Sequence, residues 1–155
     1  MLGAWPRRAR RRADLLDLGT DSDGGIVVGD HNINDPHGGR ATGAGTDRIV
    51  GSNGDDLLIA DSSVADASVT VAGNDSIIGR GGNDTLFGDN VNFKGNASVG
   101  TAGGDDSLGG GDGADTLRAG PGDDFLNGGP HKGDDCDDEA GTDAASRCEI
   151  LAGVP

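Results

Sequence analysis

A nine-residue repeat constrains this chain more than any other feature of its sequence. Alignment on an Asp that follows a Gly-rich step gives seven successive copies: GTDRIV, GSNGDDLLI, GNDSII, GRGGNDTLF, GGDDSLG, GGDGADTLR and AGPGDDFLN. Each copy has an Asp at its sixth position and an aliphatic residue two positions later. A fixed period of this kind is typical of a solenoid, in which each repeat packs only against its neighbours.

The phased residues predict which side chains face inward. The sixth-position residues are Asp47, Asp56, Asp75, Asp84, Asp106, Asp115 and Asp124, and the aliphatic residues are Ile49, Leu58, Ile77, Leu86, Leu108, Leu117 and Leu126. Two weaker copies follow, with Asp134 and Asp143 at the sixth position and Cys136 and Ala145 in the aliphatic position. Successive side chains alternate across a strand, so the aliphatic residue of each short strand points into the core, and two copies make one coil of about 18 residues.

The repeat resembles the calcium-binding nonapeptide GGxGxDxUx of the repeats-in-toxin (RTX, hemolysin-type) family, in which U is a large aliphatic residue. GGDGADTLR at 110–118 matches every defined position, and GRGGNDTLF and AGPGDDFLN each miss one Gly. The resemblance covers about residues 42–146, roughly two-thirds of the chain. It implies an all-β fold, a right-handed parallel β-roll or β-helix solenoid of about four to five coils.

Elementary electrostatics also points to a cation. Equivalent Asp residues on stacked coils lie about 4.8 Å apart, and two unit charges at that distance repel by about 3.5 kcal/mol at an effective dielectric of 20. Carboxylate and carbonyl oxygens in numbers of six to eight suit Ca²⁺ better than zinc, copper or magnesium. We therefore expect Ca²⁺ as the cofactor, with calcium binding and folding as one event.

The spacing of the repeats separates two edges of the solenoid. Successive phased Asp residues are 9, 19, 9, 22, 9, 9, 10 and 9 residues apart, which places insertions at 60–69 and 88–100. Copies alternate between edges, so both insertions fall on one, here named the looped edge, and the other is the regular edge. Asp30, Asp61 and Asp89 open three similar loops, which indicates a degenerate coil before residue 42.

The predicted calcium ligands follow from this assignment. They are Asp56, Asp84, Asp115 and Asp134 on the regular edge, Asp106 and Asp124 on the looped edge, and the turn glycines Gly51, Gly54, Gly79, Gly82, Gly110 and Gly113. Secondary candidates are Asp47, Asp75 and Asp143, because the first two close long loops and the third lies in a decayed repeat.

The segments outside the repeats are assigned by composition. Residues 1–18 are predicted to be a disordered basic leader, with a weak nucleic-acid or membrane patch as the alternative. Residues 19–41 form an N-terminal cap or degenerate coil, residues 42–146 the solenoid and residues 147–155 a C-terminal cap or tail. Cys136 and Cys148 favour a disulfide and an oxidising compartment, with two free thiols as the alternative.

Composition excludes several classes of protein. With 31 Gly, 27 acidic residues and 33% hydrophobic residues, the chain has no large core, and an acidic disordered tract is the alternative to the solenoid. A formal net charge of −15 argues against nucleic-acid binding, and no apolar run is long enough for a membrane span. His31, His37 and His131 are not spaced as a metal set, and no catalytic residue is assigned.

These observations favour a secreted, extracellular, non-catalytic calcium-binding module whose folding depends on calcium. Two alternatives remain. The chain could be the detached C-terminal repeat region of a secreted enzyme or toxin, as such arrays occur in the family that it resembles. It could also be a surface adhesion or matrix protein, with a cell-surface or polysaccharide partner bound through the looped edge.

Overall fold

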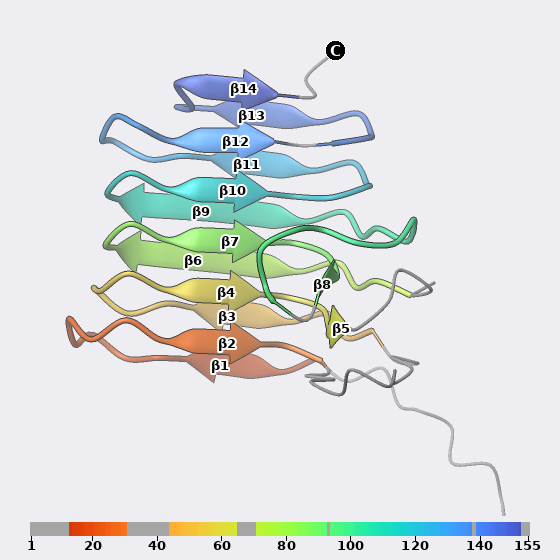
Figure 1. The fold of residues 1–155 in the computed structure, drawn as a ribbon, viewed down its shortest axis with the longest axis horizontal. Coiled ribbons are helices and arrows are strands. Elements are labelled where there is room, and N and C mark those ends of the chain that lie inside the picture. Colours follow the sequence, from red (N-terminus) through yellow and green to blue (C-terminus); the bar gives the residue numbers. More distant parts are fainter. Residues whose placement is uncertain (1–12, 31–43, 65–70, 93, 138, 153–155) are drawn as a thin grey trace, which may run out of the picture.

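The protein is built from strands stacked into a two-sided roll (Figure 1). The computed structural model describes residues 13–30, 44–64, 71–92, 94–137 and 139–152. All regular structure in these ranges is β. Two six-stranded sheets face each other, and every strand pair within them is parallel. The all-β class and the parallel roll predicted from the repeat are confirmed.

The strands of these two sheets alternate along the chain. Sheet A contains β1 (Leu15–Asp17), β3 (Arg48–Val50), β6 (Ser76–Gly81), β9 (Ser107–Asp112), β11 (Phe125–Asn127) and β13 (Ala144–Ser146). Sheet B contains β2 (Ile26–Val28), β4 (Leu57–Ile59), β7 (Thr85–Phe87), β10 (Thr116–Arg118), β12 (Asp135–Asp137) and β14 (Ile150–Ala152). One strand from each sheet makes one coil, so the roll has six coils.

The core is a double column of phased aliphatic side chains. In sheet A the register aligns Ile49, Ile77, Leu108 and Leu126, and in sheet B it aligns Leu58, Leu86 and Leu117. All seven are at most 1% exposed and form one cluster. Cys136 continues the sheet B column, and Val27, Leu16 and Ala145 extend the cluster toward its ends. The inward positions predicted from the period are therefore confirmed.

Glycine is needed where the turns of adjacent coils almost touch. A Cβ on Gly82 would lie 2.5 Å from the carbonyl oxygen of Gly54, and a Cβ on Gly113 would lie 1.8 Å from that of Gly82. Both residues also have positive φ, of 107° and 144°. The regular spacing of glycine thus allows the coils to stack at the distance of a β-sheet.

The insertions all lie at the same edge of the roll. The turns from sheet B to sheet A form the looped edge, at the right of Figure 1, and the short turns from sheet A to sheet B form the regular edge. The first two strands of the looped edge, β5 (Ser63–Val64) and β8 (Val91–Asn92), pair in parallel as a third small sheet. At these two strands the insertions therefore stack on each other and continue the coil-to-coil register.

Both ends of the roll differ from the boundaries expected from the sequence. Leu15–Asp17, assigned above to the leader, form β1 and pair with β3. Ile150–Ala152, assigned to the C-terminal cap or tail, form β14 and pair with β12. Backbone pairing extends the roll beyond the recognisable repeats, which explains six coils instead of four to five. The basic residues 7–12 and the His31 and His37 loop lie outside the described residues.

A disulfide joins Cys136 and Cys148, as predicted, with a Cα–Cα distance of 5.9 Å. Cys136 occupies the inward position of β12 and is 1% exposed, and Cys148 packs against the same core from the turn before β14. The bond fixes the last coil to the coil before it, where the aliphatic column is reduced to Ala145.

Leu86→Ala tests the core column. Leu86 is fully buried at the centre of sheet B, so the substitution should lower the free energy of unfolding by about 2–5 kcal/mol. Ile26→Ala is the matched control, because Ile26 lies on the outer face of sheet B and is 71% exposed. Denaturant unfolding with saturating calcium measures both. Equal losses in the two variants would contradict the assignment of the core.

Candidate metal centre

A row of aspartates follows the regular edge from coil to coil. The main-chain N–H of each donates to the carboxylate of the next: Asp56 to Asp84 at 2.9 Å, Asp84 to Asp115 at 2.9 Å and Asp115 to Asp134 at 3.0 Å. At the end of the row, the N–H of Asp134 donates to Glu149 at 3.0 Å. The four residues are at most 4% exposed. The repeat thus aligns one carboxylate per coil inside the turn.

The looped edge carries an equivalent row. Its hydrogen bonds run from the N–H of Asp47 to Asp75, from Asp75 to Asp106, from Asp106 to Asp124 and from Asp124 to Asp143, at 2.6–2.8 Å. Asp47 and Asp75 are secondary candidates because they close long loops, but Asp106 also follows one, the insertion at 88–100. All three are at most 5% exposed, as Asp124 is, and their N–H groups make equivalent hydrogen bonds. The long insertions therefore leave the end of the turn unchanged.

One oxygen of most of these carboxylates has no partner. The Oδ2 atoms that are buried and accept no hydrogen bond from the described residues belong to Asp47, Asp75, Asp84, Asp89, Asp106, Asp115, Asp124 and Asp134. A buried carboxylate oxygen without a donor is costly, and such atoms are rare in native proteins. Their regular repetition along both edges indicates positions that a cation can fill.

Main-chain carbonyl oxygens surround the same position. A Cβ on Gly79 would lie 2.3 Å from Asp84 Oδ2 and 2.3 Å from the carbonyl oxygen of Gly110 in the next coil. Gly110 has the same relation to Asp115 Oδ2 and to the carbonyl oxygen of Gly128, at 2.3 and 2.6 Å. Each turn therefore places a carboxylate oxygen and a neighbouring coil's carbonyl oxygen beside a residue without a side chain.

These donors fit calcium. The two atoms nearest the position are a carboxylate oxygen and a carbonyl oxygen, and hard oxygen ligands of this kind suit Ca²⁺. In the described ranges no three His, Cys, Asp or Glu side chains gather in a cluster that could hold a metal ion. A bound cation would consequently take a large share of its ligands from main-chain carbonyl groups.

Burial disfavours the charged form of several of these carboxylates. It raises the pKa of Asp75, Asp84 and Asp124 to about 7 and that of Asp106 to about 8. The neighbouring coil's aspartate adds to this effect, as Asp115 does for Asp84. The pKa of Asp47 is raised as well, again mainly by burial. A bound cation would offset both contributions.

Asp56 differs from the rest of its row because protein groups already satisfy it. The N–H of Ser52 donates to its Oδ2 at 2.6 Å, the Ser52 hydroxyl lies 3.1 Å from both oxygens, and the N–H of Gly25 donates to its Oδ1 at 2.6 Å. The Arg80 guanidinium donates to the carbonyl oxygens of Gly51, at 2.8 Å, and of Gly19. Ser52 and Arg80 both stand at the second position of the repeat, where the consensus has Gly. These two substitutions are the sequence signal that could have shown that Asp56 is satisfied by protein groups.

A second set of acidic residues opens the loops of the looped edge. Asp30, Asp61 and Asp89 each accept the N–H of a glycine where the loop ends, namely Gly45, Gly73 and Gly104, at 3.0–3.1 Å. Asp61 and Asp89 are at most 2% exposed. Burial is the main cause of their raised pKa values, which are about 10 for Asp61 and about 9 for Asp89. The negative charge of Asp75 adds to the rise at Asp61, and that of Asp106 adds to the rise at Asp89. The sequence showed that these loops are similar, but it did not show that their first aspartate closes the loop by accepting a glycine N–H at its end.

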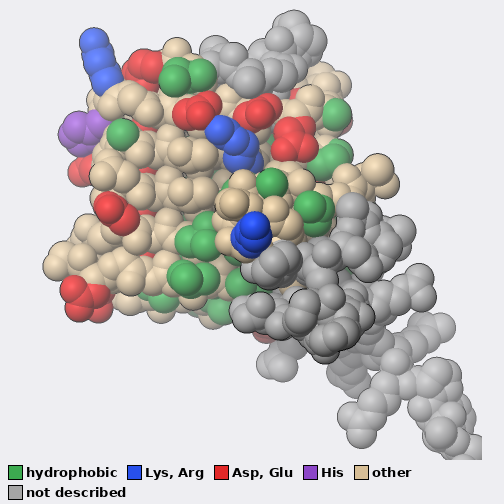
Figure 2. Space-filling view, viewed as in Figure 1, with side chains coloured by type: hydrophobic (Ala, Val, Ile, Leu, Met, Phe, Trp, Pro, Cys, Tyr) green, Lys and Arg blue, Asp and Glu red, His purple; other side chains and the backbone are tan. Residues whose placement is uncertain are grey.

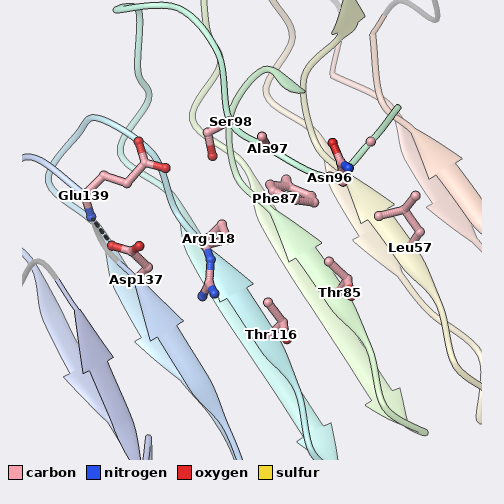
Figure 3. A pocket seen from close by; sticks show the side chains of 11 residues that line it. Leu57, Thr85, Phe87, Asn96, Ala97, Ser98, Thr116, Arg118, Asp137 and Glu139 are labelled. Atoms are coloured by element: carbon pink, nitrogen blue, oxygen red, sulfur yellow. Dashed lines mark hydrogen bonds between the residues drawn. The ribbon is translucent and has the colours of Figure 1, made fainter. Parts of the chain in front are cut away.

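The outer face of sheet B carries a groove of about 600 Å³, roofed by one insertion (Figure 3). It is lined by Leu57, Thr85, Phe87, Thr116, Arg118, Asp137, Glu139 and residues 95–98. Arg118 is paired with Asp135 at 2.7 Å.

Acidic side chains on the outer face of sheet B form separate spots instead of a continuous strip (Figure 2). The aspartate rows are therefore distinct from the exposed surface charge.

Comparison with known families agrees with this geometry. The family described as RTX calcium-binding nonapeptide repeat, in four copies, matches residues 42–63, 66–92 and 101–130, just over half of the chain. The chain belongs to this family, and its repeat region binds calcium. No curated protein and no solved structure matches the chain. Among the described residues, no helix has the length and apolar character needed to cross a membrane.

The raised pKa values predict an unusual pH dependence. A carboxyl whose pKa is higher in the folded than in the unfolded chain binds more protons when folded, so stability falls as pH rises between the two values. For Asp75, Asp84 and Asp124 that window runs from about 3.8 to about 7. With calcium chelated, circular dichroism should show more strand and a higher unfolding temperature near pH 5 than near pH 8. A stability that rises over this range would contradict the burial of uncompensated carboxylates.

Proposed function

We propose that this protein is a secreted, non-catalytic calcium-binding β-roll that folds when it meets the calcium concentration outside the cell. The observation that carries the proposal is the row of buried, unpartnered Oδ2 atoms on both edges. On the regular edge, Asp84, Asp115 and Asp134 supply carboxylate oxygens, and the turns that begin at Gly79 and Gly110 supply carbonyl oxygens. On the looped edge, carboxylate oxygens come from Asp75, Asp106 and Asp124, with Asp47 and Asp143 as the secondary ligands.

Calcium would supply the positive charge that the turns lack. The chain's own groups hold the geometry: the Asp N–H groups fix the carboxylate of the next coil, and glycine leaves room between the turns. The aliphatic columns hold the coils in register. Since each turn is shared between neighbouring coils, ion binding at one level would stabilise the coil above and the coil below.

Extracellular action is supported by three features. The repeat family is typically one of secreted proteins. The disulfide between Cys136 and Cys148 is of a kind that persists in oxidising compartments. A chain that requires calcium to fold stays unfolded where calcium is scarce and folds where calcium is abundant, because a ligand that binds only the folded state shifts the equilibrium toward that state.

Asp84→Asn and Asp56→Asn test the proposed ligands in one row. Asp84→Asn removes an unpartnered oxygen but can still accept the N–H of Asp56, so it should mainly reduce the rise in unfolding temperature that calcium produces. Asp56 is already hydrogen-bonded by Ser52 and Gly25, so Asp56→Asn should lower stability to a similar extent with and without calcium. Thermal unfolding in chelator and in millimolar calcium measures both.

Asp21→Asn is the control for charge, because Asp21 is an exposed turn residue. It should leave the calcium response of the wild-type protein unchanged. Equal effects of all three substitutions on that response would mean that calcium acts through general charge screening. A wild-type protein whose circular dichroism ignores both calcium and chelator would remove the proposal altogether.

A polysaccharide partner is the second candidate function, and the groove on sheet B is the observation that favours it. Thr85, Thr116 and Asn96 offer hydroxyl and amide groups, and Leu57 offers a half-buried apolar surface. This mixture suits a hydroxyl-rich sugar chain. The formal net charge of −15 favours a neutral polysaccharide over an anionic one.

Thr116→Trp would fill this groove and should abolish binding to immobilised neutral polysaccharides while the calcium response persists. Ser107→Trp is the matched control, because Ser107 is exposed at the corresponding strand position on the outer face of sheet A. Surface plasmon resonance in calcium measures the binding. Retained binding in Thr116→Trp, or equal loss in both variants, would rule out the groove as the site.

A further inference from the structure

The looped edge contains a buried carboxylate that the regular repeat does not have. Asp89 stands at the second position of its turn, where the next coil has Gly120. Its Oδ1 accepts the N–H of Gly104 and closes the loop, at 3.1 Å. Its Oδ2 is buried and accepts no hydrogen bond from any described residue, and the side chain as a whole is 2% exposed. One oxygen therefore serves the loop, and the other is left without a partner.

The unpartnered oxygen of Asp89 points toward the next coil. A Cβ on Gly120, which has φ of 95°, would lie 2.3 Å from Asp89 Oδ2. Beside it, a Cβ on Gly88 would lie 2.3 Å from Asp106 Oδ2 and 2.6 Å from the carbonyl oxygen of Ala119. Asp106 Oδ2 is also unpartnered. The two buried carboxylates and the carbonyl group of Ala119 thus lie around the same pair of stacked turns of the looped edge.

Asp61, the corresponding residue of the preceding insertion, does not offer the same atom. Its Oδ1 accepts the N–H of Gly73 at 3.0 Å, and its Oδ2 accepts the side-chain amide of Asn90 at 3.4 Å. Asn90, the residue after Asp89, thus satisfies Asp61 from the next coil, and both oxygens of Asp61 have partners in the protein. The difference between the two insertions is that Asp61 faces Asn90 and Asp89 faces a glycine.

We propose that Asp89, together with Asp106 and the carbonyl oxygen of Ala119, holds a calcium ion with one more carboxylate than a regular turn provides. The inference rests on the proposed function, because it uses the cation that the aspartate rows require. A second carboxylate strengthens the attraction for a divalent ion, and ligand charge is one of the quantities that set calcium affinity. The insertion at 88–100 would therefore add a ligand as well as a loop.

Asp89→Asn tests this assignment by isothermal titration of the whole chain with calcium. The substitution keeps the shape of the side chain and an oxygen for the N–H of Gly104. The variant should bind one calcium ion fewer, or bind one of its ions about tenfold or more less tightly. Without calcium its unfolding temperature should be no lower than that of the wild type, whereas the rise on adding calcium should be smaller.

Asp61→Asn is the matched control and should retain the wild-type number of bound ions. Asp89→Glu is a second variant, which keeps the carboxylate and should therefore keep the number of bound ions. It separates loss of the carboxylate from a general failure to fold. Wild-type binding in Asp89→Asn, or the same loss in Asp61→Asn, would overturn the inference. In that case a calcium response that remains sensitive to Asp84→Asn would leave the proposed function intact, whereas a wild-type chain that binds no calcium would overturn both.

Discussion

The buried carboxylates of neighbouring coils are the constraint on which the rest of the structure depends. Stacking the coils at the spacing of a β-sheet places one aspartate directly above another, inside turns where water does not reach it. The N–H of each aspartate satisfies one oxygen of the next, which fixes the carboxylate and leaves the other oxygen bare. The same hydrogen bonds that build the roll therefore create its demand for a cation.

The other regular features of the chain follow from this stacking. Glycine occurs where the main chain of one turn approaches the carbonyl oxygen of another, as at Gly82 and Gly113. The phased aliphatic side chains form one continuous cluster along the roll, and Ile59, Phe87 and Val91 form a second one. At the turn between β3 and β4 on the regular edge, protein groups satisfy the polar atoms: Ser52 donates to Asp56, and Arg80 donates to the carbonyl oxygen of Gly51. That part of the roll can close on protein groups alone, whereas Asp84, Asp115 and Asp134 in the later turns of this edge each keep an Oδ2 that accepts no hydrogen bond from the described residues.

The sequence predicted most of the fold because a nine-residue period determines which side chain faces inward without any reference to distant contacts. The columns of Ile77 and Leu86 and the position of the insertions followed from spacing, and the Cys136–Cys148 bond was favoured over two free thiols because the chain has no other cysteine. The ends could not be predicted in this way, since β1 and β14 depend on main-chain pairing and carry no repeat signal. The equivalence of Asp75 and Asp106 was also hidden, because it arises from loop closure by Asp61 and Asp89, twelve and fifteen residues from the glycines that they contact.

Anomalous scattering from crystals grown with calcium tests the central claim most directly. The account predicts peaks between successive turns on both edges, beside Oδ2 of Asp84, Asp115, Asp106 and Asp124, and none beside Oδ2 of Asp56, which Ser52 satisfies. Calcium found only at exposed carboxylates, with the turn positions empty and the coils still stacked, would contradict it.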